Sequence, residues 1–125
     1  MASTKSRTSL WSSQTLTAGS GDTTSSVIDL SSGYGAQVDI TLTNGGTGPT
    51  VAAQCQVWVA NDYNAGSPTL FTKFGGALQG GTTNSGVYYF SVELPLAVAA
   101  MKLVAGSNTG QDVTINADIS NVTAI

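Results

Sequence analysis

The clearest periodic pattern in this chain lies in the segment AQVDITLT, residues 36–43. Apolar residues occupy every second position and therefore share one face of an extended strand: Ala36, Val38, Ile40 and Leu42. A period of two with polar residues between indicates a β-strand that has one buried face.

The segment VAAQCQVWVA, residues 51–60, shows the same alternation, with Cys55 on the apolar face and Trp58 on the polar face. The loop NGGTGPT, residues 44–50, joins the two segments. Because alternating strands on either side of a glycine-rich loop are typical of a hairpin, we expect the two strands to be antiparallel neighbours.

Further strand-like segments recur between turn residues along the rest of the chain. They lie at residues 9–17, 25–30, 69–74, 87–94, 99–105 and 112–119. The total is about eight strands, with no convincing helix. Short strands separated by Gly, Asn and Ser loops predict an all-β fold: a two-layered antiparallel β-sandwich, most simply a jelly roll.

The most apolar stretch is LPLAVAAMKLVAG, residues 94–106, which is too short for a membrane helix of about 20 apolar residues. Pro95 opposes the start of a helix, and the preceding VYYFSVEL is rich in β-branched and aromatic residues. We therefore expect two strands joined by a corner at residues 94–97. Their apolar residues should lie in the core of the sandwich: Tyr88, Phe90, Val92, Leu94, Met101 and Leu103.

Residues 1–9 are rich in Ser and Thr and have no apolar period, which predicts a mobile N-terminal arm ahead of one sandwich domain at residues 10–125. Ordering about ten residues costs roughly 10–20 kcal/mol of backbone entropy. Burial of Trp11 returns roughly 4–6 kcal/mol, at about 25 cal/mol per Å² over about 150–250 Å². An ordered arm therefore needs backbone hydrogen bonds as well, as when a strand is added to the edge of a neighbour's sheet.

Charged residues make up only 9% of the chain, against about 25% in typical globular proteins, so uncharged polar residues must cover the surface. Such a surface loses little on contact with another protein, which favours a component of an assembly, although secreted sugar-binding modules share this composition. The net charge of −3 argues against nucleic acid as a partner. The charge is also uneven, because Lys5 and Arg7 precede a body with two lysines and seven acids.

Few residues are suited to metal binding or catalysis. The chain has no His and one Cys, which excludes an intrachain disulfide and the usual zinc and Cys/His chemistries. Cys55 lies in phase with the apolar residues of its strand and is expected to be a buried thiol. Asp62, Asn64 and Gly66 resemble the start of a calcium loop, but Lys73 stands where the twelfth position needs Glu, which predicts a plain turn. We expect no catalytic site, no metal and no cofactor.

Aromatic residues outside the apolar faces are the best candidates for binding. Trp58 lies on the polar face of its strand and Tyr63 in the loop that follows, and Tyr34 and Tyr89 are further candidates. Exposed aromatic rings on a β-sandwich stack on sugar rings or anchor protein contacts. A loop that covers Trp58 is the alternative explanation, and it requires no binding role.

Two segments, GVYYFSVELPLAVAAMKLVAGSNTGQDVTINADIS at residues 86–120 and QVWVANDYNAG at residues 56–66, resemble small structural proteins of tailed bacteriophages. The resemblance is to the β-sandwich decoration or cement proteins of capsids, in whole-domain style over about residues 36–119. It implies a virion protein on the capsid surface, trimeric or otherwise symmetric, that binds the major capsid protein across the joints between its subunits. No motif of that family can be placed on individual positions of this chain.

The resulting hypothesis is a non-enzymatic virion protein that reinforces a phage head. Four residues of the arm and its anchor are the expected contacts with the shell: Lys5, Arg7, Leu10 and Trp11. The alternative is a carbohydrate-binding module that binds a glycan through Trp58 and Tyr63, and a tail or baseplate component is a third hypothesis. The N-terminus has no apolar segment of a secretory signal, so we expect synthesis in the host cytoplasm.

Overall fold

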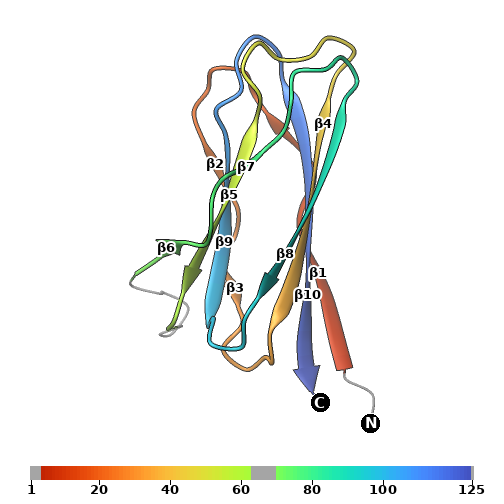
Figure 1. Cartoon of the computed structure of the whole chain (residues 1–125). Coiled ribbons are helices and arrows are strands. Elements are labelled where there is room, and N and C mark those ends of the chain that lie inside the picture. The colour runs from red at the N-terminus through yellow and green to blue at the C-terminus, as the bar shows by residue number, and fades with distance from the viewer. Residues whose placement is uncertain (1–3, 63–69, 125) are drawn as a thin grey trace.

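The computed structural model describes residues 4–62 and 70–124, which form ten β-strands and no helix. The strands build two antiparallel sheets that pack face to face (Figure 1). Sheet I contains β1 (Thr4–Leu16), β4 (Ala36–Asn44), β8 (Val87–Leu94) and β10 (Val113–Ala124). Sheet II contains β2 (Thr23–Thr24), β3 (Ile28–Asp29), β5 (Gln54–Ala60), β6 (Thr72–Lys73), β7 (Leu78–Gln79) and β9 (Ala100–Gly106). The predicted two-layered all-β sandwich is confirmed.

The strand pairing is that of a jelly roll. β1 pairs with β10, β2 and β3 with β9, β4 with β8, and β5 with β6 and β7, all antiparallel. The chain therefore forms one long hairpin of four strand pairs, which rolls up so that alternate pairs lie in opposite sheets. The resulting orders are β1-β10-β4-β8 and β2-β9-β5-β6, as expected for a jelly roll.

The prediction that β4 and β5 are neighbours is wrong. β4 pairs with β8 and β10 in sheet I, whereas β5 pairs with β9, β6 and β7 in sheet II. The connection from Asn44 crosses from one sheet to the other, and the buried Asn44 side chain donates hydrogen bonds to the carbonyls of Gly81 and Thr83. Both strands alternate in sequence because each buries one face against the shared core, and alternation does not reveal which strand lies alongside.

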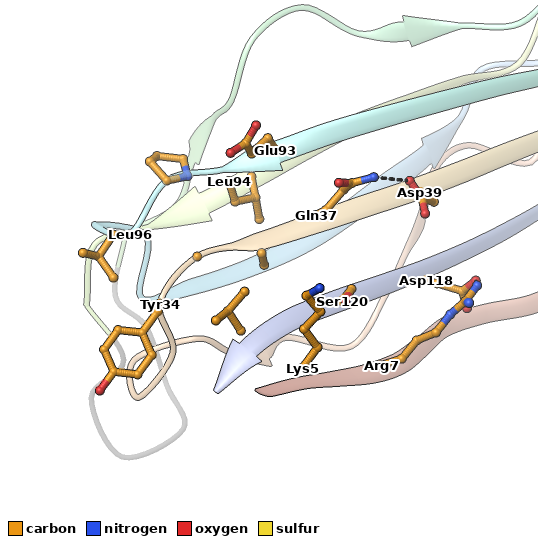
Figure 2. A pocket seen from close by; sticks show the side chains of 14 residues that line it. Lys5, Arg7, Tyr34, Gln37, Asp39, Glu93, Leu94, Leu96, Asp118 and Ser120 are labelled. Carbon is orange, nitrogen blue, oxygen red and sulfur yellow. Dashed lines mark hydrogen bonds and ion pairs between the residues drawn. The ribbon is translucent and has the colours of Figure 1, made fainter. Parts of the chain in front are cut away.

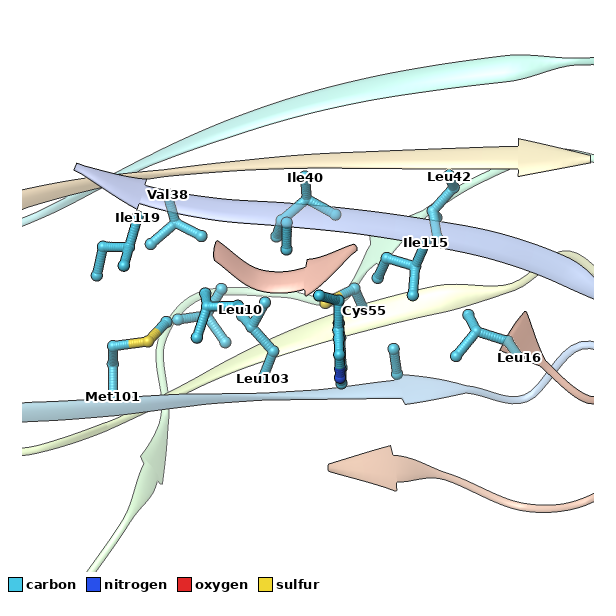
Figure 3. Close-up of a cluster of buried hydrophobic side chains, with 14 of the residues drawn as sticks. Leu10, Leu16, Val38, Ile40, Leu42, Cys55, Met101, Leu103, Ile115 and Ile119 are labelled. Atoms are coloured by element: carbon cyan, nitrogen blue, oxygen red, sulfur yellow. The ribbon is translucent and has the colours of Figure 1, made fainter. Parts of the chain in front are cut away.

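The core lies between the two sheets, and the predicted inward faces are confirmed. Figure 3 shows side chains of both sheets meeting there. The largest fully buried apolar residues include Leu16, Ile40, Leu42, Leu94, Met101, Leu103, Ile115 and Ile119. Tyr88, Phe90 and Val92 also face the core, but they are only partly buried because β8 lies at an edge of sheet I.

The prediction of a mobile arm over residues 1–9 is wrong from Thr4 onward. β1 begins at Thr4, and residues 4–9 pair with residues 118–124 of β10. The side chains of residues 4–9 are exposed, so backbone hydrogen bonds order this segment with little burial. The sheet edge to which the segment is added belongs to the same chain.

A bulge in β1 changes the expected role of Leu10 and Trp11. The register steps from Ser9 opposite Asp118 to Trp11 opposite Ala117, so Leu10 is an extra residue in β1. Such a bulge breaks the alternation of a strand. Leu10 and Trp11 are consecutive and yet both are buried in the core, at 9% and 8% exposure.

Cys55 is fully buried near the start of β5, as predicted. Burial raises the pKa of its thiol from 9.0 to about 12, because the core removes the water that would solvate the charged thiolate. The unfolded chain therefore releases this proton at a lower pH than the folded chain.

We predict that the free energy of unfolding contains a Cys55 contribution that is full below pH 9 and is lost as the pH rises toward about 12. The slope should approach about 1.4 kcal/mol per pH unit within this window. Urea unfolding of the wild type and of Cys55→Ala across this range measures it. The two proteins differ only at position 55, so a difference between their slopes comes from the thiol and not from the lysines and tyrosines. Equal slopes would contradict the prediction.

Candidate functional site

A groove lies on the outer face of sheet I, near the end of the sandwich where residues 4 and 124 lie. Its volume is about 580 Å³. Strands β1, β10, β4 and β8 form its floor, and the two turns at residues 30–35 and 95–99 close one end (Figure 2). The side chains that line it include Lys5, Arg7, Tyr34, Gln37, Asp39, Glu93, Leu96, Asp118 and Ser120.

Strand register places these side chains in rows. Arg7 lies opposite Ser120, Ser120 opposite Gln37, and Gln37 opposite Glu93, so one row crosses all four strands of sheet I. In β4, β8 and β10, neighbours of this row such as Val38, Val92 and Ile119 point toward the core, because side chains alternate along a strand. The hydrophobic alternation that builds the core therefore also directs these polar side chains to the outer face.

The groove concentrates charge on a weakly charged protein. Of the eleven charged residues, four basic and seven acidic, five line the groove. In the described part of the chain, the side chains of Lys5 and Glu93 have no ion-pair or hydrogen-bond partner. The groove therefore presents one cation and one anion to a partner.

Asp39 and Asp118 face each other across β4 and β10. Like charges directly opposite in adjacent strands repel. Arg7 forms an ion pair with Asp118, while Ser91 Oγ and Gln37 Nε2 donate hydrogen bonds to Asp39 at 2.9 and 3.2 Å. The hydrogen bond to Asp118, and then the charge of Asp118, raises the pKa of Arg7, which favours its charged form.

Two exposed apolar side chains stand at the closed end of the groove. Tyr34 is 48% exposed and Leu96 is 65% exposed. The turn that carries Tyr34 is fixed to β10, because Tyr34 N–H donates to the Val122 carbonyl and Val122 N–H donates to the Gly35 carbonyl. Gly35 has a φ of 97°, and a Cβ there would lie 3.3 Å from the Leu94 carbonyl oxygen, so glycine suits this close approach.

The structure separates the predicted site residues. Lys5 and Arg7 lie in the groove, whereas Leu10 and Trp11 belong to the core and are unavailable to a partner, so their assignment as contacts is wrong. Tyr63 lies outside the described residues. Tyr34 was among the aromatic candidates, whereas Leu96 was missed, because only the strand order brings the turns that carry them to the same end.

Trp58 lies on the outer face of sheet II, far from the groove in the fold, and is partly buried. Lys73 of β6 pairs with it across the strands, and Lys73 Nζ lies 5.6 Å from the centroid of the indole. A hollow of about 180 Å³ beside the ring is lined also by Gln54, Gln56 and Asp22. The indole Nε1 is buried and has no hydrogen-bond partner among the described residues.

The described residues contain no group of three or more His, Cys, Asp or Glu side chains that could hold a metal ion. Of the residues that resemble a calcium loop, Asn64 and Gly66 lie outside the described residues. Within the same described ranges, no helix has the length and apolar character needed to cross a membrane.

Comparison with known proteins shows the fold alone. No protein-family model and no curated protein sequence matches this chain. Among solved structures, the infectious bursal disease virus Gx strain is similar over 98% of this chain and 32% of its own, with a TM-score of 0.56 and 8% identity. The VP2 subviral particle of the same virus is similar over 97% of this chain and 33% of its own, with a TM-score of 0.57 and 9% identity.

A family 16 carbohydrate-binding module is also similar, over 81% of this chain and 70% of its own, with a TM-score of 0.50 and 11% identity. The chain spans about a third of the length of the viral proteins that it matches. The fold and the groove define a jelly-roll β-sandwich with a polar outer-face groove, a fold shared with viral capsid proteins and with a carbohydrate-binding module.

Arg7 should stabilise the fold by offsetting the repulsion between Asp39 and Asp118. We predict that Arg7→Gln lowers the melting temperature at neutral pH and low salt, and that the difference shrinks in 1 M salt, where the screening length is about 3 Å. Adding Asp39→Asn to Arg7→Gln should restore most of the loss. Equal melting temperatures for the wild type and Arg7→Gln at low salt would contradict this account.

Proposed function

We propose that this protein is a non-enzymatic virion structural protein that decorates the outer surface of a phage head and stabilises contacts between major capsid subunits. The observation that carries the proposal is the jelly-roll topology, which the chain shares over nearly its whole length with viral capsid proteins. The resemblance of residues 86–120 and 56–66 to phage decoration proteins gives the more specific role, and a tail or baseplate location is its nearest variant.

The groove is the proposed contact with the shell. Most of the remaining surface is uncharged, so contact with another protein leaves few ions to desolvate. Lys5 and Glu93 lack partners among the described residues and are therefore free to pair with charges of a capsid subunit. Tyr34 and Leu96 supply apolar area at the end of the groove, where Tyr is typical of interface hot spots.

Symmetry would strengthen such a contact. One groove offers a few charged and apolar side chains, which is a modest interface. A head presents the same site many times, and a homo-oligomer that engages several sites together gains avidity without any new kind of contact. The proposed partners are thus the major capsid protein and further copies of this chain.

The charge of the groove provides a direct test. We predict that Lys5→Gln with Arg7→Gln raises the concentration needed for half-saturation of empty phage heads by about tenfold or more, as measured by co-sedimentation. The matched control is Lys73→Gln with Lys102→Gln, which removes the same charge from sheet II and should bind like the wild type.

Equal weakening by both double variants would point to net charge rather than the groove. If neither the wild type nor the control bound to heads, the capsid role itself would be contradicted. Circular dichroism of each variant shows whether the sandwich remains folded.

A second candidate function is carbohydrate binding on the outer face of sheet II. The observation that favours it is the hollow of about 180 Å³ that Trp58 lines together with Gln54 and Gln56. The Trp58 ring offers a stacking surface for a sugar ring, and the glutamine amides can hydrogen-bond to sugar hydroxyls. Trp58→Ala should abolish binding on a glycan array, and a wild type that binds no glycan would dispose of this candidate.

A further inference from the structure

The described strands leave four sheet edges, and one of them differs from the rest. In sheet I, β1 is interrupted by register shifts and carries Lys5 and Arg7. In sheet II, the edge positions are occupied by the two-residue strands β2, β3, β6 and β7. Bulges, cations and short strands are the usual means by which proteins prevent edge-to-edge pairing.

β8 has none of these protections. Residues 87–94 pair with β4 in one unbroken register and contain no Lys, Arg or Pro, with Glu93 as the only charge. Among the described residues, β4 is the only strand that pairs with β8. Eight consecutive residues therefore form an open edge.

The direction of the free backbone groups follows from the ladder. Asn44 N–H donates to the Gly86 carbonyl, and antiparallel pairs alternate between hydrogen-bonded and non-hydrogen-bonded positions. Tyr88, Phe90 and Val92 consequently bond toward β4. The N–H and C=O groups that point away from β4 belong to four residues: Val87, Tyr89, Ser91 and Glu93.

Two of the outward side chains along this edge are large, apolar or aromatic, and exposed. Tyr89 is 77% exposed and Val87 is 43% exposed on the outer face. A hollow of about 340 Å³ lies beside Tyr89 and is lined also by Asp39, Thr41 and Ser91. The edge therefore carries a protruding ring next to a depression.

We propose that β8 pairs with β8 of a second copy of this chain, antiparallel about a two-fold axis at Phe90, so that the two copies of sheet I become one continuous sheet. A two-fold axis perpendicular to the sheet keeps the outer faces on the same side and reverses the strand direction. Tyr89 then lies opposite Ser91 of the second copy, and Val87 lies opposite its Glu93.

The centred register is the one that uses all four free residues. A shift of two residues one way would place Val87 opposite Pro95, which has no N–H. A shift the other way would place Glu93 opposite Ser85, whose φ of 54° takes the chain out of strand conformation. In the centred register Glu93 also faces an apolar residue and not another carboxylate.

The second copy fits this edge because the surface is self-complementary. The Tyr89 ring of each copy comes beside Ser91 of the other, next to the hollow that Ser91, Asp39 and Thr41 line. Such an isologous contact closes as a dimer. A three-fold ring would instead pair β8 with β1, whose edge is bulged and cationic. The dimer does not rest on the capsid role, because it forms from the chain alone.

Sedimentation velocity over a concentration series measures the association. The wild type should pass from monomer to dimer as the concentration rises. Tyr89→Lys should weaken dimerisation by at least about tenfold, because two added cations would approach across the axis. The matched control Thr114→Lys adds the same charge to the outer face of β10, away from the edge, and should dimerise like the wild type.

Amide hydrogen exchange tests the register. In the dimer, the amides of Val87, Tyr89, Ser91 and Glu93 should be protected, and on dilution or in Tyr89→Lys they should exchange at least about tenfold faster, while Phe90 and Val92 stay protected. A wild type that stays monomeric at about 1 mM, or a dimer or trimer in which the four amides exchange fast, would overturn the proposal. Protection that appears only after phage heads are added would also overturn it, by assigning the edge to a strand of another protein.

Discussion

The antiparallel pairing of β1 with β10 is the interaction on which the rest of the structure depends. It joins the beginning of the described chain to its end and places β10 between β1 and β4 in sheet I. It also orders residues 4–9, whose exposed side chains contribute little burial of their own. Through this pairing Lys5 and Arg7 come to lie beside Asp118 and Ser120, and without it the groove would have no cationic wall.

The sequence predicted the strands well because each buries one face against a common core. Apolar residues alternate from Ala36 to Leu42 and again around Cys55. This alternation requires only that each strand bury one face against the core. Which strand lies alongside is decided by pairing over long sequence distances, and this is why β4 and β5 were wrongly expected to be neighbours. A local pattern of apolar residues does not show which distant strand is the pairing partner.

The candidate site was predictable only in part for the same reason. Lys5 and Arg7 stood out by their charge, but their partners Asp118 and Asp39 are distant in sequence. The sequence did not reveal the register shift between Ser9 and Trp11. This shift places Leu10 and Trp11 in the core, although both were expected to contact a partner. Tyr34 was a candidate as an aromatic residue outside the apolar faces. Leu96 was not, because its role beside Tyr34 arises from two turns that meet at one end of the sandwich.

The central claim is that the groove end of the sandwich faces a capsid. A cryo-electron microscopy reconstruction of empty phage heads saturated with this protein tests it most directly. The account predicts density for the sandwich on the outer surface of the head, oriented so that the groove on sheet I and the turns that carry Tyr34 and Leu96 contact capsid subunits. Bare heads, or sandwiches bound through the opposite end, would contradict it.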